Sequence, residues 1–69
     1  MLRGAGQIVG FGRYSEMKAG VPPVFFPGDI LVVMAVEADG VLACQLADAN
    51  GRPVPSVSDT IFIEELAER

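Results

Sequence analysis

The chain has no histidine, no tryptophan and a single cysteine, Cys44. Histidine is the commonest general base in enzymes and, with cysteine, the usual zinc ligand, so these gaps remove most candidate catalytic and metal sites. A lone cysteine cannot form a disulfide within the chain. We therefore expect no catalytic residue, no bound metal and no cofactor.

Basic residues are also scarce. Five lysines and arginines, scattered along the chain, face nine aspartates and glutamates, which gives a net charge of −4. Proteins that bind nucleic acid usually present a cationic stripe to the phosphates. We expect no direct contact with DNA or RNA.

Long apolar segments are missing as well. The unbroken apolar run Ile30 to Val36 is far shorter than the roughly 18 residues of a membrane span. The start of the chain, MLRGAGQIVG, is interrupted by glycines and lacks the continuous apolar core of a signal peptide. A lone cysteine also suits a reducing compartment. The sequence predicts a cytoplasmic protein without membrane contact.

The length fits one domain, residues 1–69, in which we expect residues 1–6 to be flexible. Hydrophobic residues make up 51% of this short chain, and a domain of 69 residues has little interior to hold them. Small domains often gain stability by associating. We therefore expect a homo-oligomer.

Short strands joined by turns dominate the pattern. Asp39-Gly40 and Asn50-Gly51 are typical of hairpin turns, and a long loop with three prolines separates the first strand from the second. An all-β fold is expected, a small barrel of about five short antiparallel strands. The predicted strands are residues 7–14, 30–37, 41–48, 52–57 and 60–63, with the loop at 15–27 and one helical turn within 64–69.

The order of these turns resembles an SH3-like barrel. In that family a long loop leads to a Gly-Asp turn, here Gly28-Asp29, and later to a Gly-Arg turn, here Gly51-Arg52. A Val-Pro-Ser step follows at residues 54–56, and a Glu-Glu-Leu sequence ends the match at residues 64–66. The resemblance covers roughly residues 7–66 and implies the barrel alone, since the aromatic groove for polyproline has no tryptophan here.

A narrower resemblance is to the type II dihydrofolate reductases, which are SH3-like barrels that form tetramers around a pore. Their catalytic surface includes a Val-Gln-Ile-Tyr stretch. The corresponding residues here are 59–62, Asp-Thr-Ile-Phe, of which Ile61 matches. This resemblance implies an enzyme with its site at the centre of an oligomer.

The apolar run Ile30 to Val36 raises the question of what covers its second face. Alternate side chains point to opposite faces of a strand, and both sets here are apolar. We expect the set with Leu31 and Val33 to point outward, beside Val41 of the next strand, and to pack on another copy of the chain. The alternative is that the long loop covers this face. Cys44 is expected on the inner face, buried and inert.

Two further segments are candidate contact sites. We expect Phe26 to cap the barrel and Phe25 to lie near the surface, where an aromatic residue on a stiff loop makes a good binding anchor; the alternative is a loop folded over the barrel end. Acidic residues near the end of the chain form either a solvated face or an anionic patch for a basic partner. They are Asp59, Glu64, Glu65 and Glu68.

Three functions follow as hypotheses. The first is a non-enzymatic interaction or assembly module that self-associates and contacts another protein. The second is a small acidic inhibitor, from a phage or other mobile element, that blocks a nucleic-acid-handling protein through Glu64 and Glu65. The third is an enzyme with a pore site at the centre of an oligomer.

Overall fold

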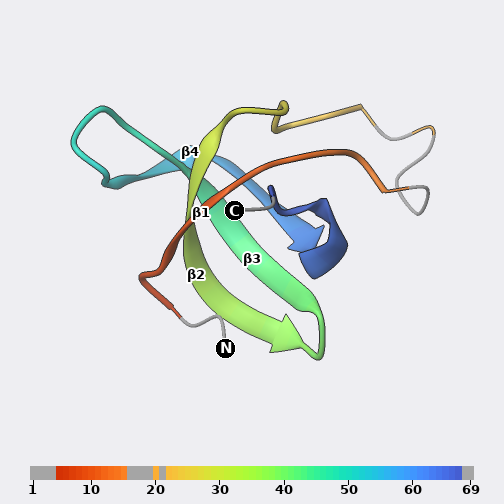
Figure 1. Ribbon diagram of the computed structural model, residues 1–69. Coiled ribbons are helices and arrows are strands. Elements are labelled where there is room, and N and C mark those ends of the chain that lie inside the picture. The colour runs from red at the N-terminus through yellow and green to blue at the C-terminus, as the bar shows by residue number, and fades with distance from the viewer. Residues whose placement is uncertain (1–4, 16–19, 21, 68–69) are drawn as a thin grey trace.

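The computed structural model describes residues 5–15, 20 and 22–67. Four antiparallel strands form one sheet in the order β1-β2-β3-β4 (Figure 1). The elements are β1 (Ile8–Gly10), β2 (Ile30–Ala38), β3 (Val41–Ala47), β4 (Pro53–Phe62) and a 3-10 turn, η2 (Ile63–Glu65). The fold is therefore all-β, as the sequence predicts.

The last two predicted strands are one strand. Residues 52–57 and 60–63 were expected as separate strands, but β4 continues through both. Its pairing with β3 shifts between Gln45, which pairs with Ser58, and Leu46, which pairs with Val54. The intervening residues of β4 bulge out of the ladder. Such bulges bend a strand without ending it, so the prolines near the start of β4 are accommodated at the sheet edge.

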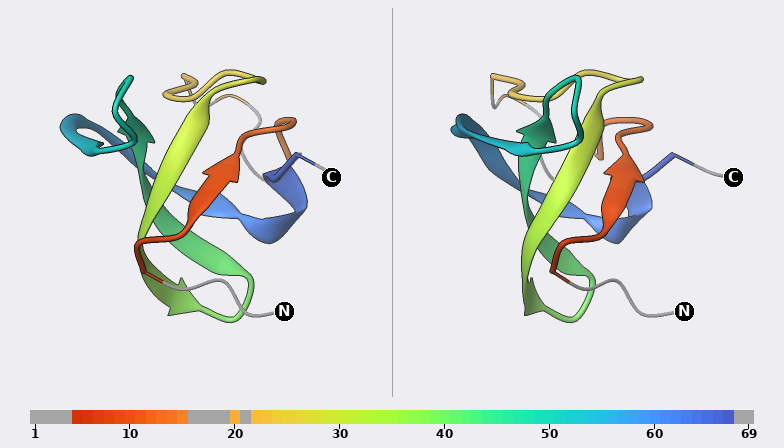
Figure 2. Two further views of the ribbon diagram at one scale, coloured as in Figure 1. Left: turned by 60° about the vertical axis from the view of Figure 1, so that its left-hand side comes forward. Right: turned by 90° about the vertical axis from the view of Figure 1, so that its left-hand side faces the viewer.

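Strand β2 is bent by two bulges. Its pairing with β3 is interrupted between Val33 and Ala35 and again between Val36 and Ala38. Each bulge places one extra residue in β2 and increases the local twist. Figure 2 shows the result, a strongly curled sheet in which β2 and β4 cross at a steep angle.

The hydrophobic core lies inside this curl. Leu31 pairs with Leu46, Val33 with Cys44, and Leu42 with Ile61, so inward side chains of neighbouring strands meet. The buried core consists of Val9, Phe11, Phe25, Leu31, Val33, Leu42, Cys44, Ile61 and Leu66, with Leu46 and Val57 packed against it. Burying apolar surface in this way is the main stabilising term for the domain.

The described sheet is not closed between β1 and β4, and the end of the chain joins its β1 side. Phe11 and Leu66 form an isolated antiparallel bridge. Gly12 N donates to Glu65 O at 2.7 Å, and Ala67 N donates to Gly10 O at 2.8 Å. The segment after η2 therefore covers the backbone groups that follow β1, which limits edge-to-edge association there.

Close approach explains a glycine at this junction. A Cβ on Gly12 would lie 2.7 Å from Ala67 Cα and 2.8 Å from Ala67 N. Only a residue without a side chain lets the two backbones pack so closely. A Cβ on Gly10, by contrast, would meet only the Cβ of Ala67, at an ordinary 3.5 Å.

The start of the chain is partly bound to the sheet. Residues 1–6 were expected to be flexible; 1–4 lie outside the described residues. Gly6 N donates to Val33 O at 2.6 Å, and Val33 N donates to Gln7 O at 2.9 Å. The chain is thus hydrogen-bonded to β2 from Gly6 onward.

Candidate functional site

The outer face of β1 and β2 carries an exposed apolar patch. The register pairs Ile8 with Val32 and Gly10 with Ile30, so these residues share the face opposite to the core. Ile8 is 48% exposed and Ile30 50% exposed, whereas Val32, which pairs with Ile8 on the same face, is buried at 5%. Met34, at the first bulge, adds a partly exposed thioether chain. We call Ile8, Ile30, Val32 and Met34 the apolar face.

The predicted outward positions of β2 were wrong. Leu31 and Val33 are both fully buried in the core rather than exposed. Both sets of alternating residues in this strand are apolar, so hydrophobicity alone does not decide which set turns inward. The outward apolar set exists, but its members are the neighbouring residues of the apolar face.

A register argument could have found the correct set. A two-residue hairpin loop at Asp39-Gly40 pairs Ala38 with Val41. Counting back along an unbroken ladder places Val36, Met34 and Val32 beside the outward residues of β3. The two bulges then change the partners without reversing the face at Val32, which pairs with Gln45.

Val41 lies on the outer face of β3 and Cys44 on its inner face, as the sequence predicts. Val41 is half-buried and pairs with Phe62 on the outer side of the sheet. Cys44 is buried in the core, 1% exposed, which confirms its predicted inner position. A thiol without access to solvent cannot meet a large reagent or substrate in the folded state.

The two phenylalanines of the loop exchange their predicted places. Phe25 is 2% exposed and lies 6.2 Å, centroid to centroid, from the ring of Phe11. Phe26 is 55% exposed. The expectation that Phe25 lies at the surface and Phe26 caps the core was therefore wrong.

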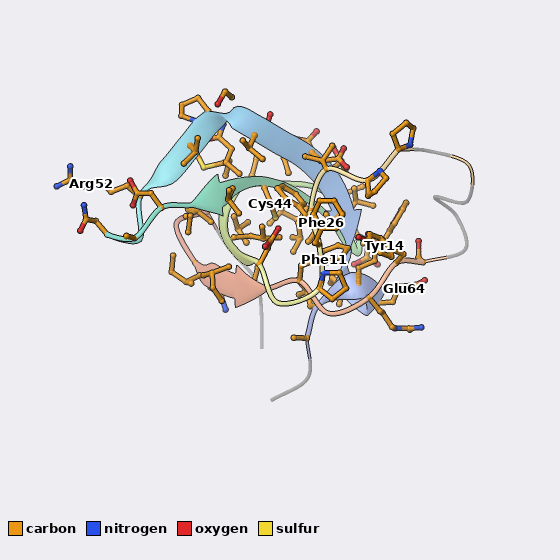
Figure 3. The ribbon with its side chains drawn as sticks, turned by 90° about the horizontal axis from the view of Figure 1, so that it is seen from above. Phe11, Tyr14, Phe26, Cys44, Arg52 and Glu64 are labelled. Carbon is orange, nitrogen blue, oxygen red and sulfur yellow. The ribbon has the colours of Figure 1, made fainter. Side chains whose placement is uncertain are left out.

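A turn fixes this arrangement. Asp29 N donates to Phe26 O at 2.9 Å, and Phe26 N donates to Asp29 Oδ2 at 2.9 Å. Pro27 and Gly28, with φ of 99° at the glycine, are typical of a type II turn. Phe26, labelled in Figure 3, starts this turn and is exposed, while the preceding residue, Phe25, accepts a hydrogen bond from the Tyr14 hydroxyl at its carbonyl oxygen.

The acidic residues near the end of the chain do not form one exposed cluster. Glu65 is fully buried; its Oε1 accepts a hydrogen bond from Phe62 N at 2.9 Å and its Oε2 accepts one from Ser15 N at 3.0 Å. Glu64 is exposed, and Arg13 Nε donates to its carbonyl oxygen at 3.1 Å. Glu68 lies outside the described residues. The prediction of Glu65 as a surface contact is therefore corrected: it is an internal acceptor.

A hollow of about 250 Å³ opens on the outer face between β2, β3 and β4. It is an open depression with both apolar and polar walls. Sequence reasoning missed it, because it depends on how the β2 bulge and the bend of β4 meet. Its walls are the outward residues Met34, Ala43, Gln45, Ser58 and Thr60, with atoms of Cys44 and Asp59, which alternate with them along β3 and β4.

The described part of the chain holds no group of three histidine, cysteine, aspartate or glutamate side chains placed to bind a metal ion. In residues 5–15, 20 and 22–67, no helix is long and apolar enough to span a membrane. Comparison of the chain with family models, with curated proteins and with solved structures finds no match.

Proposed function

We propose that this protein is a non-enzymatic interaction module that self-associates through its apolar face. The observation that supports the proposal is the exposure of Ile8 and Ile30, which lie diagonally across from each other on one face of β1 and β2. Leaving large aliphatic side chains in water forgoes roughly 1–2 kcal/mol of burial free energy for each half-exposed residue. A contiguous apolar surface on a sheet is typical of a contact site.

The charge pattern favours a second copy of the chain as the partner. The outward positions of β1 to β3 that the register defines are all uncharged: Ile8, Gly10, Ile30, Val32, Ala35, Ala38, Val41, Ala43, Gln45 and Ala47. The chain as a whole carries a net charge of −4, so two copies repel unless they meet through an uncharged surface. A two-fold contact of this face with itself meets that condition, because it places apolar surface on apolar surface.

We also propose that the fold is an SH3-like barrel and that the protein is cytoplasmic. The barrel proposal is supported by the sequential antiparallel order of the four strands and by the bridge between Phe11 and Leu66 near the sheet opening. The location is supported by the single buried cysteine, which suits a reducing compartment.

Light scattering on a sizing column tests self-association. We expect the native chain to elute with the mass of two or more copies, and Ile30→Glu to elute as a folded single chain. Val24→Glu is the matched control, since Val24 is also an exposed aliphatic residue but lies in the loop; its mass should equal that of the native chain.

Two results would count against the proposal. A single-chain mass for the native protein at every concentration would exclude self-association. An oligomer that persists in Ile30→Glu would exclude the apolar face as its interface. Circular dichroism on each variant separates a lost interface from a lost fold.

A further inference from the structure

The outer edge of β4 presents backbone groups in a defined pattern. Ile63 N donates to Gly40 O at 2.9 Å, just beyond the pair Val41–Phe62. A bond in this position flanks a non-hydrogen-bonded pair, so the N–H and C=O of Phe62 point away from β3. Because these directions alternate along an antiparallel ladder, the backbone N–H and C=O groups of Thr60 and Ser58 also point away from β3.

Side-chain carboxylates hold two of these outward N–H groups. Phe62 N is bound by Glu65 Oε1, and Glu65 is buried and anchored by a second bond to Ser15. Thr60 N donates to Asp59 Oδ1 at 2.8 Å. The bond between Thr60 and Asp59 joins adjacent residues in an exposed setting. The carbonyl oxygen of an added strand can therefore replace the Asp59 carboxylate at Thr60, while the bond between Phe62 and Glu65 stays in place.

The hollow described above lies directly beside this edge. Ser58 and Thr60 form one wall, and Met34 and Ala43 contribute apolar surface across β3 and β2. Gln45 also lines the hollow, and its Oε1 is buried with no hydrogen-bond partner in the described part of the chain. In Figure 3, β4 runs along the margin of the molecule.

We propose that the outer edge of β4 binds an extended basic segment of a partner protein, which pairs with Thr60 as an added antiparallel strand. A residue opposite Thr60 shares its face of the sheet and lies over the hollow. The next residue lies opposite Asp59 and on the other face. An apolar side chain at the first position and a lysine or arginine at the second therefore match the surface.

Charge distinguishes this occupant from a second copy of the chain. β4 itself, PVPSVSDTIF, contains no basic residue. A second β4 at this edge would bring another Asp59 toward the first one, and like charges on adjacent strands are unfavourable. A basic segment instead supplies an opposite charge to a protein with a net charge of −4. This proposal uses the backbone edge of β4, whereas self-association uses the outward side chains of β1 and β2; the two surfaces meet at Met34, which lines the hollow.

A synthetic peptide tests the site. The probe is a blocked heptapeptide in which lysine and valine alternate, titrated into 15N-labelled protein while amide resonances are followed by NMR. We expect the Ser58 and Thr60 amides to shift, and hydrogen exchange at Thr60 to slow on binding. A peptide with N-methylated valines, which cannot donate those main-chain hydrogen bonds, should bind at least about tenfold more weakly if the main chain pairs.

Matched variants test the charge. Asp59→Lys should weaken binding of the lysine peptide by about tenfold, since like charges then meet across the new pair. Glu37→Lys changes the net charge by the same amount at an exposed position on β2, and should change binding much less. The spectrum of each variant shows whether the fold is retained.

Three outcomes would overturn the proposal. The first is the absence of binding at millimolar peptide. The second is equal binding by the N-methylated peptide, or equal effects of the two lysine variants. The third is a shift of the β4 amides with protein concentration alone, which would assign this edge to a second copy. Repeating the peptide titration in Ile30→Glu shows whether binding at β4 depends on self-association through the apolar face, so that failure of one proposal can be told from failure of the other.

Discussion

The buried carboxylate of Glu65 holds the backbone of Ser15, fifty positions earlier, at 3.0 Å. Its other oxygen holds Phe62. One side chain thus ties the start of the long loop and the end of β4 to the turn η2. A carboxylate with two backbone N–H donors is suited to this task because both of its oxygens accept.

Replacing this acid by its amide tests that role. Glu65→Gln keeps one oxygen but directs an NH2 group at a backbone N–H, which leaves a buried donor without an acceptor and should lower the free energy of unfolding by about 1–3 kcal/mol. Urea denaturation measures the change. Glu64→Gln, at an exposed neighbour, is the control and should change stability by less than about 0.5 kcal/mol. Equal effects of the two variants would contradict the assignment.

Ser15 carries a buried hydroxyl in addition to the backbone N–H that Glu65 binds. It is 5% exposed, and its hydroxyl oxygen is buried without a hydrogen-bond partner in the described structure. Ser15→Ala removes that hydroxyl and keeps the backbone N–H that binds Glu65, so stability should stay equal or rise by up to about 1 kcal/mol. Thermal unfolding measures this, with the exposed Ser56→Ala as a neutral reference. A clear loss of stability in Ser15→Ala would show that the hydroxyl is bound.

The junction between β1 and the end of the chain depends on Gly12. Gly12→Ala would force apart two backbones that leave no room for a Cβ, and we expect a loss of about 1–3 kcal/mol from overpacking. Gly10→Ala places its Cβ at an ordinary contact distance and should cost far less. Hydrogen exchange at Ala67, whose N–H binds Gly10 O, should become faster in Gly12→Ala only. Similar exchange in both variants would argue against the close approach.

The adjacent phenylalanines provide a matched pair. Phe25→Ala removes a buried ring packed on Phe11 and should cost about 3–5 kcal/mol. Phe26→Ala truncates a ring that is more than half exposed and should cost less than about 1 kcal/mol. Chemical denaturation of both variants measures the difference. The opposite order of effects would restore the sequence-based expectation that Phe26 is the core residue.

Reactivity of Cys44 reports on opening of the core. A buried thiol reacts only when the structure opens. In native buffer, a bulky thiol reagent should label it at least about a thousandfold more slowly than in denaturant, given the usual free energy of unfolding of small domains. The rate of colour development with an aromatic disulfide measures this. Fast labelling of the native chain would place Cys44 at the surface.

The sequence by itself determined the β character, the positions of β2 and β3, and the turn between them. These features are local: the run from Ile30 onward favours strand, and Asp39-Gly40 favours a tight connection. The buried position of Cys44 also follows from local alternation with Leu42. Each of these predictions needs only neighbours along the chain.

Only the tertiary structure decided which apolar residues face the core, because a count back from the Asp39-Gly40 hairpin gives the right face of β2 only when its bulges come in a pair. Leu31 and Ile30 are chemically similar, and the register of β2 against β3, with its bulges, buries the first and exposes the second. The burial of Glu65 depends on Ser15, and the room at Gly12 depends on Ala67, both distant in sequence. Such outcomes arise from contacts between segments far apart in the chain, which local propensity and hydrophobic alternation do not specify.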